Sequence, residues 1–333
     1  MAPKSTINEL VDHARTCART APGEQMQREI DRYAELFDEQ CTPGVRAALN
    51  IFSFHVDVPS SHRVINYVDV KHDHGAFDYR RLAAHLVWAG ARFNREVHTL
   101  FVTNDTCPAP PPQPGLSIIR LPTDDRAPML ERVKAMAAYV QSRAFTQDTA
   151  FLDTDAFPNR SLKSIFDDCF DIGVTYRTTA GYMPLNEGVI FCSHSDPAAA
   201  ARFFCAYAAT YEHLARDPTV RSYYGDVGRW RGGQLSLNAI ACPPGDLNKV
   251  PAFERNGVRI ALLPCNRFNY WVTRTLHPGA KSWDRKFVLH LKGDSKLLAE
   301  HVIGYQLDRA TARPTGTATR PASSGVETSD VVV

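Results

Sequence analysis

The stretch TAFLDTDAFPNRSL, residues 149–162, decides how the chain is interpreted. Its apolar run ends in two aspartates one residue apart, Asp153 and Asp155. Carboxylates beside a core cost free energy unless something pairs with them. In an extended segment, side chains two residues apart point to the same side, so these two can hold one hard divalent cation. A strand-ending turn capped by aspartates is the alternative interpretation of the same triplet.

Strands and helices alternate on both sides of this stretch. Before it, the pattern predicts strands over 64–70, 98–105, 116–123 and 150–152 and helices over 79–93 and 129–143. After it, we expect strands at 171–178, 186–192, 258–265 and 286–293, with helices over 197–215 and after Gly232-Gly233. Such alternation is typical of an α/β fold whose mainly parallel sheet binds ligands at the carboxyl ends of its strands. The two aspartates lie at one such end.

Length and composition limit the domain organisation and the class of protein that the chain can be. The chain has 333 residues, of which 44% are hydrophobic and 22% charged, as in an ordinary globular domain. We expect a helical N-terminal extension over 1–57, one domain over 58–308, and a disordered tail rich in Thr, Ser, Pro and Gly over 309–333. The formal net charge of +2 does not support binding to nucleic acid.

The cysteines and the N-terminus indicate a cellular compartment. The eight cysteines are scattered and no two form a C-x-x-C pair, which argues against a zinc or redox motif. The first twenty residues lack the apolar core of a signal peptide, and no apolar run is long enough to cross a membrane. We therefore expect a cytoplasmic protein, whose contact with a membrane, if it has one, is peripheral.

Several weak motifs follow the aspartates in a fixed order. The first is N-x-G before an apolar strand, with Asn186 and Gly188, and the second is Q-x-x-x-N, with Gln234 and Asn238. They are followed by L-P-x-x-x-N, with Pro264 and Asn269, and by H-x-x-G-x-x-K, with His290, Gly293 and Lys296. Taken singly, each has an ordinary structural explanation. The histidine could be a satisfied core residue, the lysine a solvated charge and the first asparagine the start of a turn.

Together with Asp153-Thr-Asp155, this order resembles retaining glycosyltransferases of family eight, the glycogenin and lipopolysaccharide galactosyltransferase-like enzymes. The resemblance covers about Val64 to Lys296 and rests on short motifs. It implies a GT-A-like single domain: a central, mainly parallel mixed sheet flanked by helices, with a Rossmann-like nucleotide-sugar half over 58–160 and an acceptor half over 161–308. It also implies transfer of a hexose-type sugar from a nucleotide sugar, most simply a UDP-sugar, with retention.

The resemblance assigns a role to each matching residue. Asp153, Asp155 and His290 would hold Mn²⁺ or Mg²⁺, and Lys296 and Gly293 would meet the donor diphosphate. The other implied donor contacts are a first strand around Tyr67, Val68 and Asp69 for the base, Lys134 on the helix before the aspartates, and Asn186 and Gly188 near the sugar. Gln234 would lie below the anomeric carbon. The acceptor, whether glycan, lipid-linked or protein, is not implied.

The chain also departs from the family pattern. The family usually has an aspartate just before the glutamine, where this chain has Gly233, and Lys296 is not followed by the usual Pro-Trp. Asp226 could supply the missing carboxylate or be a turn residue. With Asp284, it is also a candidate base for an inverting enzyme, which needs a carboxylate on the acceptor side. The sequence is also compatible with a sugar-nucleotide pyrophosphorylase, or with a non-catalytic protein that binds a nucleotide sugar.

Overall fold

The structure is a computed structural model that describes residues 4–41, 47–57, 78–177, 183–224, 232–273 and 280–312. Within these ranges, eight strands form one sheet in the order β3-β2-β1-β4-β7-β6-β9-β8. Their bounds are β1 Leu49–Phe54, β2 Val97–Thr103, β3 Leu116–Arg120, β4 Thr149–Leu152, β6 Ile172–Tyr176, β7 Leu185–Cys192, β8 Ala252–Arg255 and β9 Val258–Pro264.

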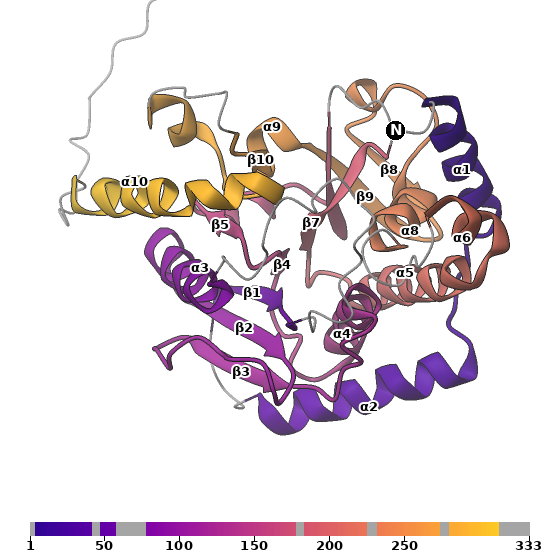
Figure 1. The fold of residues 1–333 in the computed structure, drawn as a ribbon, viewed down its shortest axis with the longest axis horizontal. Helices are drawn as coiled ribbons and strands as arrows, with labels where there is room; N and C mark the ends of the chain where they lie inside the picture. The colour runs from indigo at the N-terminus through magenta and orange to yellow at the C-terminus, as the bar shows by residue number, and fades with distance from the viewer. Residues whose placement is uncertain are drawn as a thin grey trace, which may run out of the picture.

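Most strands of this sheet run in one direction. Neighbours pair in parallel from β3 through β4 and again between β6 and β9, whereas β7 and β8 run antiparallel to their neighbours. Helices cover both faces of the sheet (Figure 1). The expected α/β fold with a mainly parallel mixed sheet is thereby confirmed.

The central strands are apolar because both of their faces are buried. In β1, Phe52 contributes to a core on one face and Ile51 to a second core on the other, as the alternation of side chains in a strand requires. The first core is covered by α2 Glu24–Gln40, α4 Pro128–Gln141, α5 Pro197–Arg216 and α8 Gly232–Ala241. The second lies under α3 Tyr79–Phe93 and α10 Ala299–Ala312, and α10 lies above α3 in Figure 1.

A small second sheet brings the end of the chain back to the aspartates. Its order is β10 Tyr270–Trp271, β11 Val288–His290 and β5 Ala156–Pro158. The Asp153-Thr-Asp155 turn connects β4 directly to β5, and β11 pairs antiparallel with β5 so that His290 lies opposite Ala156. The backbone N–H of Leu291 donates to the carbonyl of Asp155 at 2.9 Å. Sheet pairing therefore places His290 beside the aspartates despite the long sequence separation.

The N-terminal helices belong to the globular fold. Helix α2 packs four buried side chains into the first core, and α1 Lys4–Thr16 packs on α8 and α6 Pro218–Tyr224 in a third, smaller core. Strand β1 lies before residue 58, so the sheet begins within the segment expected to be an N-terminal extension. The strand expected at 64–70 lies outside the described residues, as does the expected tail from residue 313 on, whereas its first residues, 309–312, form the end of α10.

The remaining short elements are η3 Lys163–Ile165, η4 Leu247–Lys249, α9 Cys265–Phe268, η5 Ala280–Arg285 and η6 Gly293–Leu298. All eight cysteines are free thiols. Among the described helices, none combines the length and apolar character needed to cross a bilayer.

Candidate active site

Asp153, Asp155 and His290 converge at the carboxyl end of β4. His290 Nε2 lies 3.1 Å from Asp155 Oδ1 and 3.5 Å from Asp153 Oδ2. One ligand atom from each residue lies within 4.8 Å of the others, and His290 and Asp155 are buried. Two carboxylate oxygens and one imidazole nitrogen are a donor set that suits a hard or borderline divalent cation such as Mn²⁺ or Mg²⁺.

The neighbours of His290 determine which of its nitrogens carries the proton. Asn269 donates its Nδ2 to Asn186 Oδ1 at 2.7 Å and to Thr175 Oγ1 at 2.9 Å, so its Oδ1 is an acceptor. His290 Nδ1 lies 2.8 Å from that oxygen and therefore donates to it. Burial, with the nearby charge of Lys292, lowers the pKa of His290, which keeps the ring neutral. Its Nε2 lone pair then faces two carboxylates, an arrangement that a cation between them would stabilise.

Lys296 completes the charge balance around Asp155. Its ammonium lies 2.7 Å from Asp155 Oδ2. Burial alone raises the pKa of Asp155, but Lys296 and His290 outweigh burial and the pKa lies below its ordinary value. Burial likewise lowers the pKa of Lys296, and Asp155 raises it more. Both groups are therefore charged at neutral pH, so this end of the sheet carries a fixed carboxylate with a fixed cation beside it.

Gly188 keeps the space between Asp153 and His290 open. A Cβ at this position would lie 2.5 Å from Asp153 Oδ2 and would overlap His290 Cε1. No side chain fits there unless the ligands move. The N-x-G motif therefore has a steric reason in this fold, because the glycine lets β7 approach the two ligands closely.

Helix α4 contributes Arg132. Its Nη2 lies 3.0 Å from Asp153 Oδ1, and its Nη1 lies 3.7 Å from Glu187 Oε2. The guanidinium is buried, and its Nη1 has no hydrogen-bond partner among the described residues. The family resemblance implied a donor contact for Lys134, and that role stays a prediction, although Arg132 is the cation of α4 that reaches the aspartates. The Lys134 ammonium instead forms ion pairs with Glu29, at 2.8 Å, and with Glu131.

A chain of amides connects the glutamine to the histidine. Asn186 Nδ2 lies 3.4 Å from Gln234 Oε1, and Asn186 Oδ1 accepts from Asn269 and from the Gly188 N–H. Asn269 in turn accepts from His290. The structure thus brings Gln234, Asn186, Gly188, His290 and Lys296 into one connected group with the two aspartates.

The other predicted residues fall into two sets. Gly293 begins η6 with φ +52°, in the left-handed region that favours glycine, and a Cβ on it would meet no described atom within 4 Å. Tyr67, Val68, Asp69 and Asp226 lie outside the described residues. The first described strand is β1. Its end lies beside the aspartates, where Ser53 Oγ is 3.2 Å from Thr154 Oγ1.

Sequence reasoning missed two residues of the site, Arg132 and Glu187. Arg132 has the same charge and lies on the same helix as Lys134, and only the three-dimensional orientation of α4 distinguishes them. Glu187 could have been noticed as the one charged residue inside the apolar run LNEGVIFC. Asn269 was recognised as part of a motif, but its hydrogen bond with His290 was not predicted.

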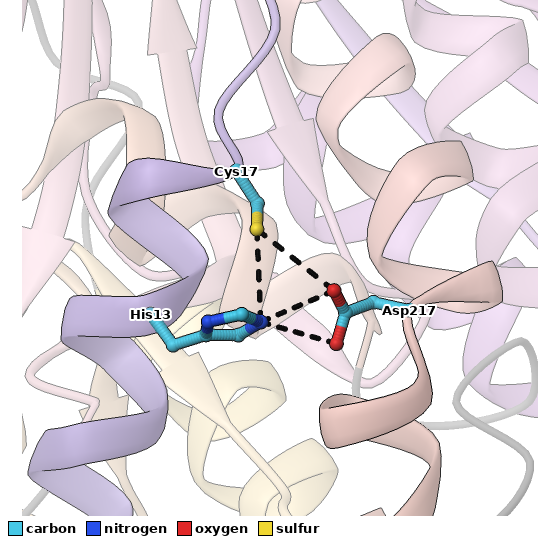
Figure 2. A group of neighbouring side chains, drawn as sticks. All are labelled: His13, Cys17 and Asp217. Atoms are coloured by element: carbon cyan, nitrogen blue, oxygen red, sulfur yellow. Dashed lines mark hydrogen bonds and ion pairs between the residues drawn. The ribbon is translucent and has the colours of Figure 1, made fainter.

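A second group of possible metal ligands lies near the N-terminus. His13 Nε2 is 3.1 Å from both carboxylate oxygens of Asp217, and Cys17 Sγ is 3.6 Å from the same nitrogen (Figure 2). Asp217 also accepts the Val220 N–H at 3.0 Å, so it caps α6. We interpret this group as a hydrogen-bonded tie between α1 and α6. A similar group consists of His55 and Asp57, which follow β1, and Cys107, which follows β2.

Comparison with known proteins gave structural matches only. No protein-family model and no curated protein sequence matches the chain. One solved structure that matches is that of a glycosyltransferase involved in the glycosylation of the major capsid of PBCV-1. The match has TM-score 0.45 and 14% identity and covers 76% of this chain and 98% of that one. The bifunctional glycosyltransferase WbbM matches with TM-score 0.47 and 9% identity, over 82% of this chain and 51% of that one.

The galactosyltransferase LgtC, solved with donor and acceptor sugar analogs, matches with TM-score 0.42 and 10% identity, over 80% of this chain and 98% of that one. Identities and TM-scores at this level do not assign the chain to a family. The functional assignment therefore rests on the residues of the site.

Proposed function

We propose that the chain is a metal-dependent glycosyltransferase of GT-A type that transfers a hexose-type sugar from a nucleotide sugar, most simply UDP-linked, to an acceptor. The observation that carries the proposal is the convergence of Asp153, Asp155 and His290, with the neutral histidine directing its Nε2 lone pair at the carboxylates. This donor set, next to the Lys296 ammonium, suits a cation shared with a diphosphate.

Asp153, Asp155 and His290 would hold Mn²⁺ or Mg²⁺. When bound, such an ion neutralises negative charge as it develops on a departing phosphate. Lys296 would share that role from the protein side, because its ammonium is fixed beside Asp155. Arg132 would hold the orientation of Asp153 through the 3.0 Å ion pair. The site thus places two cationic side chains around the two aspartates.

Retention is the outcome that these residues favour. A retaining transfer needs no strong protein base if the leaving phosphate takes the proton of the acceptor. Gln234 would orient the sugar, and its own orientation is set by Asn186. An inverting enzyme would need a free carboxylate base on the acceptor side. One candidate, Asp284, accepts the Tyr305 hydroxyl at 2.6 Å and pairs with Arg309 at 3.1 Å, which ties it to α10.

The nucleotide would lie where β1 ends. Asp153-Thr-Asp155 and the end of β1 are neighbours in the sheet, and Tyr79 stacks on His55 with ring centroids 4.4 Å apart. The Lys296 ammonium lies 6.0 Å from the centre of the Tyr79 ring. These aromatic rings lie beside the proposed diphosphate site and could accept a base. The acceptor stays open between a glycan, a lipid-linked sugar and a protein.

The test is a panel of nucleotide sugars with Mn²⁺, comparing the wild-type protein with Asp155→Ala. We expect release of the nucleoside diphosphate with at least one donor, and loss of turnover by about 1,000-fold or more in the variant, because the metal site loses a ligand. Calorimetric titration of UDP with and without Mn²⁺ provides a readout that does not depend on the acceptor. Equal turnover in both proteins would rule out the metal assignment.

A further inference from the structure

The position before Gln234 lacks a side chain, and the carboxylate of Glu187 occupies the space beside it. A Cβ on Gly233 would lie 3.0 Å from Glu187 Cδ and would overlap Glu187 Oε2. The two residues come from different elements, Gly233 from the start of α8 and Glu187 from β7. An acid is therefore present where the family resemblance expects an aspartate, but a different part of the chain supplies it.

An irregularity in β7 directs Glu187 toward this space. Val174 of β6 pairs with Ile190, yet the next residue, Thr175, pairs with Asn186. Residues 187–189 therefore have no partner on β6 and form a bulge. Bulges beside active sites commonly change the direction of a side chain. Here the bulge lies directly opposite the aspartates, because Leu152 at the end of β4 pairs with Val189.

Glu187 is held in place by two groups from helices. The Tyr207 hydroxyl donates to Glu187 Oε2 at 2.9 Å, and Arg132 Nη1 lies 3.7 Å from the same oxygen. Since Arg132 also contacts Asp153, one guanidinium joins the Glu187 carboxylate to the proposed metal centre. Glu187 therefore belongs to the same site as the aspartates.

The partners of Glu187 leave hydrogen-bonding capacity within a buried site. Among the described residues, Tyr207 is its one hydrogen-bond donor and acts on Oε2, so Oε1 accepts none from this part of the chain. Glu187 is only 8% exposed, and burial raises the pKa of its carboxyl to about 7 despite Arg132. The buried Arg132 Nη1 also lacks a hydrogen bond to any described residue. Buried polar atoms in native proteins are normally paired, so Arg132 Nη1 suits a polar ligand that lies beside Glu187.

We propose that Glu187 is the donor-sugar carboxylate of this enzyme, accepting a hydrogen bond from a hydroxyl of the transferred sugar on Oε1. This inference rests on the proposed function. The location supports a sugar contact: Gly233 directly precedes Gln234, and Asn186, which directly precedes Glu187, contacts Gln234. Carboxyl oxygens are good acceptors for sugar hydroxyls, and a buried polar group that would otherwise stay unpaired gives high selectivity.

The experiment moves the carboxylate from one residue to the other. It compares Glu187→Gln, Glu187→Ala, Gly233→Asp and the double variant Glu187→Ala/Gly233→Asp. Truncating Glu187 removes the atoms that a side chain at 233 overlaps, and the Tyr207 hydroxyl, 3.2 Å from the new Cβ, has to move by a few tenths of an ångström. We expect each Glu187 single variant to lower kcat/KM for the nucleotide sugar about 10- to 100-fold, which is the effect of losing one charged hydrogen bond. Affinity for UDP with Mn²⁺ should stay unchanged, because UDP carries no transferred sugar.

The double variant should regain most of that loss, whereas Gly233→Asp alone should lose activity through the clash with Glu187. Circular dichroism and the UDP titration identify variants that fail to fold. The inference is overturned if Glu187→Gln turns over the sugar as well as wild type, or if the folded double variant is no better than Glu187→Ala. Failure of the wild-type protein to bind UDP with Mn²⁺ would instead reject the proposed function.

Discussion

Two of the groups in which a histidine approaches carboxylate and other ligand atoms within the described residues differ in where the histidine proton lies. At the end of β4, His290 Nδ1–H donates a hydrogen bond to Asn269 Oδ1, which leaves Nε2 unprotonated and able to bind a cation. Near the N-terminus, His13 directs Nε2 at both oxygens of Asp217, as a donor would, and Asp217 is occupied in capping α6. Proximity of ligand atoms is therefore not sufficient for a metal site; the neighbours must fix the tautomer.

The largest effect that tests this comparison comes from Gly188→Ala. The added Cβ would lie 2.5 Å from Asp153 Oδ2 and would overlap His290, so the ligands must separate. We expect Mn²⁺ affinity to fall below detection by isothermal titration calorimetry. Gly304→Ala is the control, because a Cβ there meets no described atom within 4 Å. If Gly188→Ala still binds Mn²⁺, the ion must bind at a different site.

Asn269→Ala tests the tautomer itself. The variant frees His290 Nδ1 from its acceptor, so the ring can rotate or move its proton to Nε2. We expect Mn²⁺ affinity to fall about 10- to 100-fold, as for other residues that orient a metal ligand. Asn94→Ala is matched for burial but hydrogen-bonds to Gly90 and Leu162 instead. Its Mn²⁺ affinity should equal that of wild type, and a similar loss in both variants would contradict a specific role for Asn269.

A third histidine, His85, gives a pH test away from both groups. Burial lowers its pKa to about 4, and its Nε2 lies 2.7 Å from Gln306 Oε1. Because the folded pKa is below the ordinary value of 6.5, the unfolded chain binds the proton first. The stability from His85 is complete above pH 6.5 and is lost as the pH falls toward 4. By about pH 5 the loss should reach about 2 kcal/mol.

Denaturant unfolding of wild type and His85→Gln between about pH 7 and pH 5 measures this effect. The glutamine keeps a neutral donor, so the variant should lose less stability over this range. Parallel pH profiles for the two proteins would contradict a neutral, buried His85.

The smallest expected effect belongs to the N-terminal group. His13→Ala should lower the free energy of unfolding by about 1 kcal/mol, as for a partly exposed ion pair, and should not change Mn²⁺ affinity. Asp217→Asn keeps an oxygen for the Val220 N–H and should cost less. Both are measured by urea unfolding. A rise in Tm on adding Zn²⁺ to wild type, absent in His13→Ala, would mean that this group binds metal after all.

Several elements around the candidate site could be predicted from sequence, because they have a local signal. The helix at Tyr79–Phe93 and the strand leading to Asp153 follow from apolar periodicity and length. Strand β1 was missed because Leu49–Phe54 is buried on both faces and shows no alternation. Such a short apolar run does not identify itself as a strand. What places it in the sheet is pairing with β2 and β4, which is not a local property.

Contacts between distant residues explain the remaining differences. Arg132 and Lys134 lie on the same helix, and which of them reaches the aspartates depends on two contacts across the fold, that of Arg132 with Asp153 and that of Lys134 with Glu29. The role of Asn269 depends on the pairing of β10 with β11, which brings it next to His290. The relation of Glu187 to Gly233 depends on how α8 packs against β7. Each requires knowing which elements are neighbours before any side chain can be assigned.

The tight fit of Glu187 against Gly233 has an evolutionary consequence. A side chain gained at 233 while the glutamate remains produces a clash, and loss of the glutamate first removes the only carboxylate of the pair. Each substitution made alone in the present chain is therefore harmful, whereas the second one compensates for the first, which is reciprocal sign epistasis. Natural relatives of this chain should carry an acid at one of the two positions and a small residue at the other, and an alignment can be read for that covariation.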